Sequence, residues 1–348
     1  MFTSLGWLRL AVGVACAALG AFALVAALGL GARGSGASTA PAAAPVPLAA
    51  YVEFAPHVAS QLVILGFQGG VRGAPLVSPH GDPPLPASDF ARPVAEYLAY
   101  AETQLKLMAG PLRSLEVALS ENDRNQAERG WEAAYARFLH LGAVYLEGPA
   151  AVLNERIDGS PGGLSGGTAS PRFTGLHRIE YGLWTGAPPD SLVGWARQLS
   201  ADVGRLRALL PRVSISPLDY ATRAHEILED AVRDLLSGAD VPWSQQGVLG
   251  TAAAVAATRE VIATLRPLIN MTVVGTELAH LNAVIDSLAA AHGGTLPTNT
   301  ELSQDQSEAL DAALGQALEA LALVPPSLET TRPPTTPTIP ARAVEIDP

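Results

Sequence analysis

Cysteine and lysine are almost missing from this chain of 348 residues, which has one cysteine and, among its 22 basic residues, one lysine. The cysteine, Cys16, lies inside an apolar run near the N-terminus, so the rest of the chain can form no disulfide and offers no thiolate. Zinc ribbons, iron–sulfur clusters and cysteine catalysis are therefore excluded. Aromatic residues are also few, at 5% against 48% hydrophobic residues overall, so alanine and aliphatic side chains must build the core.

Positive charge is scarce as well. The chain has 33 acidic and 22 basic residues, which gives a net charge of −11. A protein that binds duplex nucleic acid needs a basic surface to neutralise phosphates, so this composition argues against nucleic acid as a partner. A negative electrostatic field attracts cations instead.

The N-terminal residues 10–32 form a run of 23 without a charged side chain, between Arg9 and Arg33. A helix of this length crosses a hydrocarbon core of about 30 Å. Residues 1–33 are therefore predicted to be a signal-anchor helix, which the length favours, or a signal peptide cleaved near residues 37–40. Both interpretations place the remainder outside the cytoplasm, either on the outer face of the cell membrane or secreted or periplasmic.

The rest of the chain is expected to be all-α. Residues 34–47 have a linker composition, and residues 325–348 contain 7 prolines in 24 residues, which predicts a disordered tail. Residues 48–324 show helical periodicity almost throughout, without the alternation typical of strands. Helices are expected at 48–66, 91–120, 123–153, 173–184, 190–210, 217–237, 244–269, 272–291 and 303–323.

A glycine-rich loop, residues 158–171, leads into the most informative segment of the chain. In that segment His177 and Glu180 are three positions apart on a predicted helix, so their side chains share one face. An imidazole nitrogen and a carboxylate oxygen at this spacing can bind one metal ion, although the same spacing also occurs in surface pairs. A comparable pair, His225 and Glu229, is more typical of an intrahelical ion pair.

The segment 173–184, Phe-Thr-Gly-Leu-His-Arg-Ile-Glu-Tyr-Gly-Leu-Trp, resembles the Gly-x-His-x-x-Glu signature of the imelysin-like family, in its EfeO-type branch. The resemblance covers residues 91–324 and implies an imelysin-like double helical bundle. The cupredoxin domain that many EfeO-type proteins carry has no counterpart here. Further segments agree in order and approximate spacing: 131–135, 141–145, 156–159, 224–231 and 265–267.

The resemblance implies an extracytoplasmic component of an iron-uptake system, which acts beside a membrane iron permease and a haem peroxidase-like protein. It also implies a metal site at which iron is the expected ion, with zinc or copper as alternatives. Carried over residue by residue, His177 and Glu180 are the ligands of the motif. Asp158 matches an acid that the family places near them, and Asp240 falls where relatives have a glutamate.

Two further positions match the family less directly. Arg178 occupies a common basic position inside the motif and is expected to pair with a carboxylate. Glu102, in the first bundle helix, faces the site or is simply an exposed acid.

The chain also departs from the family pattern. Tyr135 stands where relatives often have histidine, and the segment 243–247 replaces a stretch that carries histidine and aspartate in some relatives. Three hypotheses therefore stay open: a metal-binding component of iron uptake, an imelysin-type metallopeptidase, and a noncatalytic bundle with a degenerate metal site. The sequence has no serine elbow and no His-Glu-x-x-His motif, which favours a protein that is not an enzyme.

Overall fold

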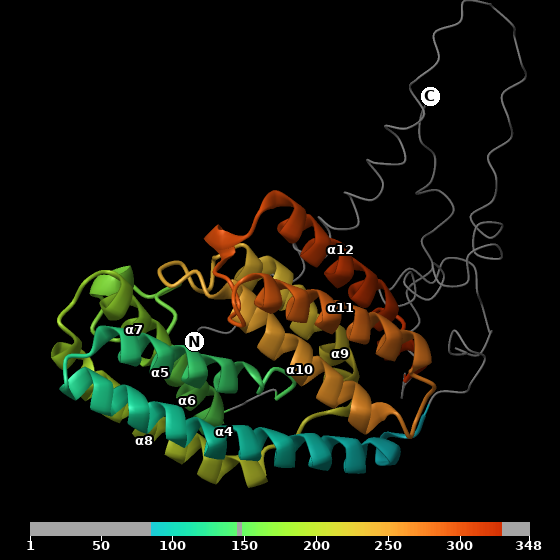
Figure 1. The fold of residues 1–348 in the computed structure, drawn as a ribbon. Helices are drawn as coiled ribbons and strands as arrows, with labels where there is room; N and C mark the ends of the chain where they lie inside the picture. The colour runs from blue at the N-terminus through green and yellow to red at the C-terminus, as the bar shows by residue number, and fades with distance from the viewer. Residues whose placement is uncertain (1–84, 145–147, 329–348) are drawn as a thin grey trace, which may run out of the picture. The chain divides into compact units, whose positions relative to one another are not determined.

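The computed structural model describes residues 85–144 and 148–328, and within these ranges the chain is helical and has no strand (Figure 1). The all-α prediction is therefore confirmed for the described residues. The predicted signal or anchor helix, the linker and the helix at 48–66 lie outside them.

Turns and loops connect the helices, the longest of the described loops spanning residues 159–174, and side chains cap several of the helix N-termini. Asp123 accepts a hydrogen bond from Gln126 N at 3.0 Å, and Ser303 forms a capping box with Gln306. The α-helices are α4 (Ala91–Ser120), α5 (Arg124–Leu139), α6 (Gly148–Asp158), α7 (Gly175–Trp184), α8 (Val193–Leu209), α9 (Pro217–Asp230), α10 (Gly247–Leu265), α11 (Thr272–Ala291), α12 (Gln304–Leu321) and α13 (Val324–Ser327).

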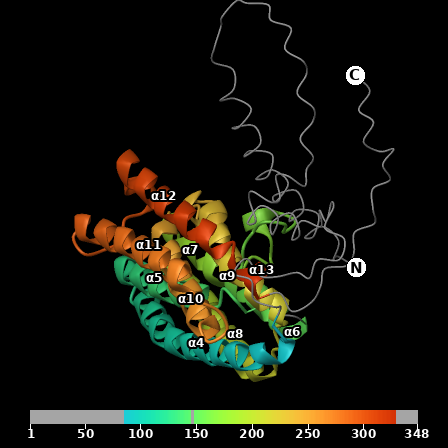
Figure 2. The same cartoon turned by 90° about the vertical axis from the view of Figure 1, so that its right-hand side faces the viewer.

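The helices pack in two groups that α10 connects. Helices α4 to α8 contact one another, with α7 held between α5, α6 and α8. The second group contains α9 and α11 to α13, and α10 packs against members of both groups (Figures 1 and 2). The shared core consists mainly of leucine, alanine, valine and isoleucine, with a few large aromatic rings such as Trp131 and Tyr97.

Helix α10 is apolar enough to cross a membrane by length and composition, and it is the one such helix in the described part of the chain. However, 67% of its apolar window is buried inside the protein. Its small residues, such as Gly250 and Ala257, let neighbouring helices approach closely. These properties identify α10 as the central core helix of the fold.

The predicted helix 123–153 is wrong, because α5 ends at Leu139 and α6 begins at Gly148. Tertiary hydrogen bonds satisfy the backbone groups that this break frees. Tyr97 Oη donates to His140 O at 3.0 Å and accepts from Ala143 N at 3.2 Å, while Arg223 Nε donates to Gly142 O at 2.6 Å.

Two other expectations need correction. The predicted helix 217–237 changes after Asp230 into a π-helical turn, η5 (Ala231–Leu236). The predicted tail starts too early, because α13 continues to Ser327 and Leu328 is only 1% exposed. The two prolines lie in the first turn of α13, where a proline costs little helix stability. The burial of apolar side chains such as Leu328 outweighs that cost.

Candidate metal centre

The ends of α6 and α7 meet at two glycines, and this contact builds the site. Gly159 has φ +76° and Gly175 has φ +72°, a conformation that favours glycine. A Cβ atom at Gly175 would lie 2.3 Å from Ile157 O, and one at Gly159 would overlap Thr174 O. This close backbone approach places Asp158, the last residue of α6, beside His177 in the first turn of α7.

Hydrogen bonds from α5 fix the position of α7. Trp131 Nε1 donates to Leu176 O at 2.8 Å. At the other end of α7, Arg124 donates to the carbonyl groups of Leu183 and Ala187, the latter at 2.6 Å. Because α7 is held at both ends, its motif side chains have little freedom to move.

His177 and Glu180 form a buried pair inside the protein, with exposed fractions of 1% and 0%. His177 Nδ1 lies 2.9 Å from Glu180 Oε2. The other carboxylate oxygen, Oε1, accepts hydrogen bonds from Ser244 N at 2.9 Å and Ser244 Oγ at 2.8 Å, and from Trp243 N at 3.3 Å. A carboxylate only accepts, so Nδ1 carries the proton and Nε2 is directed away from Glu180.

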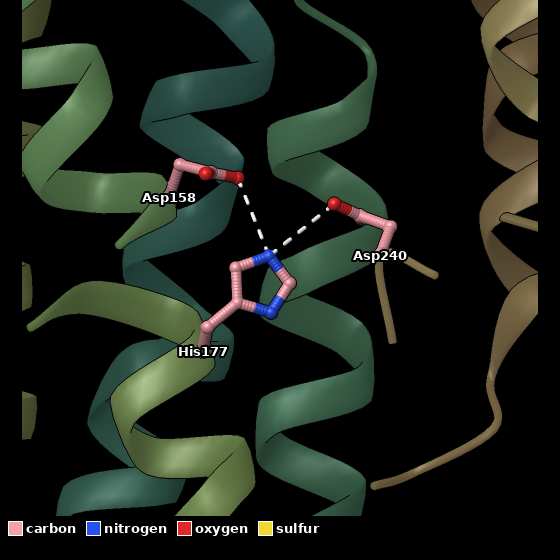
Figure 3. Close-up of side chains that lie close together, drawn as sticks. All are labelled: Asp158, His177 and Asp240. Carbon is pink, nitrogen blue, oxygen red and sulfur yellow. Dashed lines mark ion pairs between the residues drawn. The ribbon is translucent and has the colours of Figure 1, made fainter. Parts of the chain in front are cut away.

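His177 Nε2 points between two aspartates (Figure 3). It lies 3.5 Å from Asp158 Oδ1 and 3.5 Å from Asp240 Oδ1 and makes no hydrogen bond within the described ranges. These three atoms lie within 4.8 Å of one another. The side chains of Asp158 and Asp240 are 31% and 25% exposed, so the site reaches the surface on the aspartate side.

The outer oxygens of both aspartates are held by other groups. Asp240 Oδ2 accepts a short hydrogen bond from Tyr135 Oη, and Asp158 Oδ2 accepts one from Ser160 N at 3.2 Å. The backbone of Asp240 is held as well, because its N–H donates to Asp234 O in η5 at 2.9 Å. Each aspartate therefore keeps one oxygen directed toward His177.

Burial and the carboxylates act in opposite directions on the pKa of His177. Burial lowers it, but Asp158, Asp240 and Glu180 together outweigh burial and hold the pKa well above its usual value. For Asp240, burial raises the pKa, but His177 and the hydroxyl of Tyr135 outweigh it and lower the pKa. The carboxylates therefore favour the protonated imidazole, and a cation that binds Nε2 takes the place of this proton.

The structure brings together the four residues expected at the site. Asp158, His177 and Asp240 converge on one point, and Glu180 lies within hydrogen-bond distance of His177. The expectation that His177 and Glu180 bind the same ion is wrong. Glu180 contacts Nδ1 of His177, whereas Nε2 faces the two aspartates. Glu180 therefore orients the ligand, as carboxylates behind metal-bound histidines commonly do.

The two additional candidates lie elsewhere. Glu102 is exposed on α4. Arg178 stacks on the rings of Phe173 and Trp195, with its guanidinium carbon 5.4 and 5.3 Å from their centroids. It pairs with no carboxylate of the described residues, so the expected ion pair is wrong. The other histidine–glutamate pair is confirmed as an intrahelical pair, with His225 Nδ1 3.4 Å from Glu229 Oε2.

Sequence reasoning missed the groups that support the ligands. The sequence marks Tyr135 only as a departure from the family pattern. Ser244 lies in the segment 243–247, which differs from the corresponding segment of relatives. Their roles depend on contacts between residues about 60 to 105 positions apart, which no local spacing reveals.

A comparison with models of known protein families found no match, and a search of curated proteins found no similar sequence. The atoms of the site themselves indicate which ions it can bind. One imidazole nitrogen and two carboxylate oxygens suit divalent iron, zinc or manganese, and two negative charges balance a divalent ion. Nε2 is buried, lies 3.5 Å from each of the two carboxylate oxygens and makes no hydrogen bond among the described residues, an arrangement that is compatible with a shared ion.

Proposed function

We propose that the protein is an extracytoplasmic metal-binding component of an iron-uptake system and a member of the EfeO-type branch of the imelysin-like family. In this proposal Asp158, His177 and Asp240 bind iron or another divalent ion, and the protein delivers it to a membrane permease. A haem peroxidase-like protein is the further partner that the resemblance implies. The N-terminal apolar run would act as a signal or keep the protein at the outer face of the cell membrane.

The observation that carries the proposal is the convergence of His177 Nε2 with one carboxylate oxygen each of Asp158 and Asp240. All three atoms lie within 4.8 Å of one another, so a single ion can contact all of them. Nε2 is aimed between the two carboxylate oxygens at 3.5 Å, a distance that leaves room for an ion between them. Bonds of about 2 Å from each atom to a shared ion require only small movements.

The arrangement suits transfer of an ion better than permanent storage. Three ligands from one side leave other coordination positions for the group that brings or receives the ion. The partly exposed aspartates lie on the open side, and the negative net charge of the protein favours the approach of cations. When bound, the ion would act here as cargo.

The site geometry disfavours the metallopeptidase hypothesis. A metallopeptidase needs a general base within reach of a metal-bound water. Glu180, the carboxylate of the motif, contacts Nδ1 of His177, whereas the proposed ion would bind Nε2. Its oxygens already accept hydrogen bonds from His177, Trp243 and Ser244. The third hypothesis, a degenerate site, rests on the ligands that this chain lacks relative to the family, and the convergence of Asp158, His177 and Asp240 favours a site that still binds an ion.

The test is metal binding by the purified full-length chain in mild detergent, measured by elemental analysis and by titration with Fe²⁺, Zn²⁺ and Cu²⁺. We expect one ion per chain for the wild type and none for His177→Ala. His225→Ala is the matched control, because His225 pairs with Glu229 on α9 and should leave binding unchanged. Equal binding by His177→Ala would refute the proposal, and metal-dependent peptide hydrolysis would support the peptidase hypothesis instead.

A further inference from the structure

Tyr135 is an aromatic residue that contacts the site on its aspartate side. It is 0% exposed and stacks on Trp131, with ring centroids 4.9 Å apart and an interplanar angle of 10°. The edge of its ring meets the imidazole of His177 at a centroid distance of 6.2 Å. This packing fixes the hydroxyl, which donates to Asp240 Oδ2.

The hydrogen bond leaves Asp240 with one oxygen for the site. Oδ2 is engaged by Tyr135, while Oδ1 lies 3.5 Å from His177 Nε2. A hydrogen bond to a charged acceptor is stronger than one between neutral groups, and this one favours a single orientation of the carboxylate. A carboxylate without such a restraint can bind an ion through both oxygens, as aspartates and glutamates often do with calcium.

We propose that Tyr135 is a positioning residue that makes Asp240 a one-oxygen ligand and thereby favours small transition-metal ions over calcium. This inference rests on the proposed function, because it requires an ion at Asp158, His177 and Asp240. Tyr135 acts through Asp240 and does not itself bind the ion. A phenylalanine at this position would keep the stacked ring and remove only the hydroxyl.

The experiment compares the full-length wild type with Tyr135→Phe and Tyr220→Phe. Tyr220 is a matched control, since it is also 0% exposed and its hydroxyl lies 2.6 Å from Thr264 Oγ1. Titrations with Co²⁺ and Ca²⁺ give the affinities, and the visible spectrum of bound Co²⁺ reports its ligand arrangement. For Tyr135→Phe we expect about tenfold weaker Co²⁺ binding, an altered Co²⁺ spectrum and a smaller preference for Co²⁺ over Ca²⁺. Tyr220→Phe should match the wild type in all three.

The outcomes separate the two proposals. If the wild type binds no metal, both are overturned. If it binds metal and Tyr135→Phe has the same affinities and spectrum, only the role of Tyr135 is overturned. An intense visible band on addition of Fe³⁺ that disappears in Tyr135→Phe would show that the phenol oxygen is itself a ligand, which also overturns a positioning role.

A second measurement does not depend on the folding of a tyrosine variant. Infrared difference spectra of the wild type and Asp240→Asn, with and without Zn²⁺, isolate the carboxylate stretches of Asp240. A one-oxygen ligand separates its two stretches more widely than a two-oxygen ligand does. Stretches typical of two-oxygen binding would overturn the inference.

Discussion

The two nitrogens of His177 have different surroundings, and this difference defines the site at the scale of the residue. Nδ1 is satisfied by Glu180, whereas Nε2 faces Asp158 and Asp240. The sequence predicts that His177 and Glu180 share a helix face, because their spacing fixes the positions of their Cβ atoms. It cannot predict which nitrogen Glu180 contacts, since side-chain rotation and the donors from Ser244 decide that.

Metal affinity should depend steeply on pH. A metal ion needs the neutral imidazole, and the carboxylates hold the pKa of His177 well above its usual value of about 6.5. Protons therefore compete with the ion through neutral pH, so affinity should rise about tenfold per unit as pH increases from 6 toward the pKa of the folded protein. Calorimetric titration of the wild type at pH 6, 7 and 8 measures this rise. An affinity that stays constant from pH 6 to pH 8 would contradict this prediction.

The stability of the protein without metal should depend on pH in the opposite direction to metal affinity. Because the folded pKa is raised, protonated His177 stabilises the metal-free protein fully below about pH 6.5, and this stabilisation is lost as pH rises through the folded pKa.

His140 shows the reverse shift. Its ring is partly buried at the end of α5, where Nδ1 lies 2.6 Å from Tyr100 Oη. Burial, with a smaller effect of Arg137, lowers the pKa of His140 to about 4. The unfolded chain binds this proton below about pH 6.5 and the folded chain does not, so the free energy of unfolding should fall as pH decreases from 6.5 to about 4.

We expect His140→Gln to remove part of that loss of stability. The pH-dependent loss in the free energy of unfolding should differ between variant and wild type by at most about 2–3 kcal/mol near pH 4.5, because folding lowers the pKa from 6.5 to about 4. Urea unfolding at pH 7 and pH 4.5, followed by tryptophan fluorescence, measures it. His280→Gln on the exposed face of α11 is the control, and an identical pH dependence for all three proteins would contradict the prediction.

At the scale of the element, helix existence could be predicted from the sequence better than helix ends. The ranges 91–120 and 272–291 agree with α4 and α11, whose apolar periodicity continues from one end to the other. The break after Leu139 could not be predicted, because the groups that satisfy it, Tyr97 and Arg223, come from other helices. Local periodicity does not contain such tertiary contacts.

The junction of α6 and α7 should be the most sensitive backbone position of the site. In Gly175→Ala the new Cβ would lie 2.3 Å from Ile157 O, at a positive φ that alanine rarely adopts. We expect a loss of roughly 1–3 kcal/mol in the free energy of unfolding, together with weaker metal binding because Asp158 moves away from His177. Chemical unfolding and metal titration of this variant measure the two effects.

Gly315→Ala provides the matched control for that substitution. Gly315 is exposed within α12, and a Cβ there meets no atom within 4 Å. Alanine should therefore stabilise the helix by about 0.5–1 kcal/mol and leave metal binding unchanged. If both alanine variants changed stability in the same direction, the close approach at Gly175 would not be the cause.

At the scale of the whole molecule, the composition predicted the character of the core. Scarce aromatic residues and abundant alanine led to helices that pack closely through small and aliphatic side chains, with α10 at the centre. The convergence of Asp158 and Asp240 on His177 was expected only by resemblance, since these residues belong to three separate segments. Their distances depend on how α6, α7 and the turn after η5 pack together.

The folded unit extends at least to Leu328, four residues beyond the predicted end of the helical domain, and truncation tests this extension. Leu328 and Val324 are each 1% exposed and belong to the core, and α13 packs against α9. Removal of residues 325–348 exposes this surface and should cost about 1.5–3 kcal/mol, which corresponds to a fall of roughly 5 °C in melting temperature. Removal of residues 329–348 alone, which include 5 prolines in 20 residues, should leave the melting temperature unchanged because such a segment buries little apolar surface. Calorimetry of the two truncated chains and the full chain distinguishes these boundaries, and equal melting temperatures for both truncated chains would place the end of the core before Pro325.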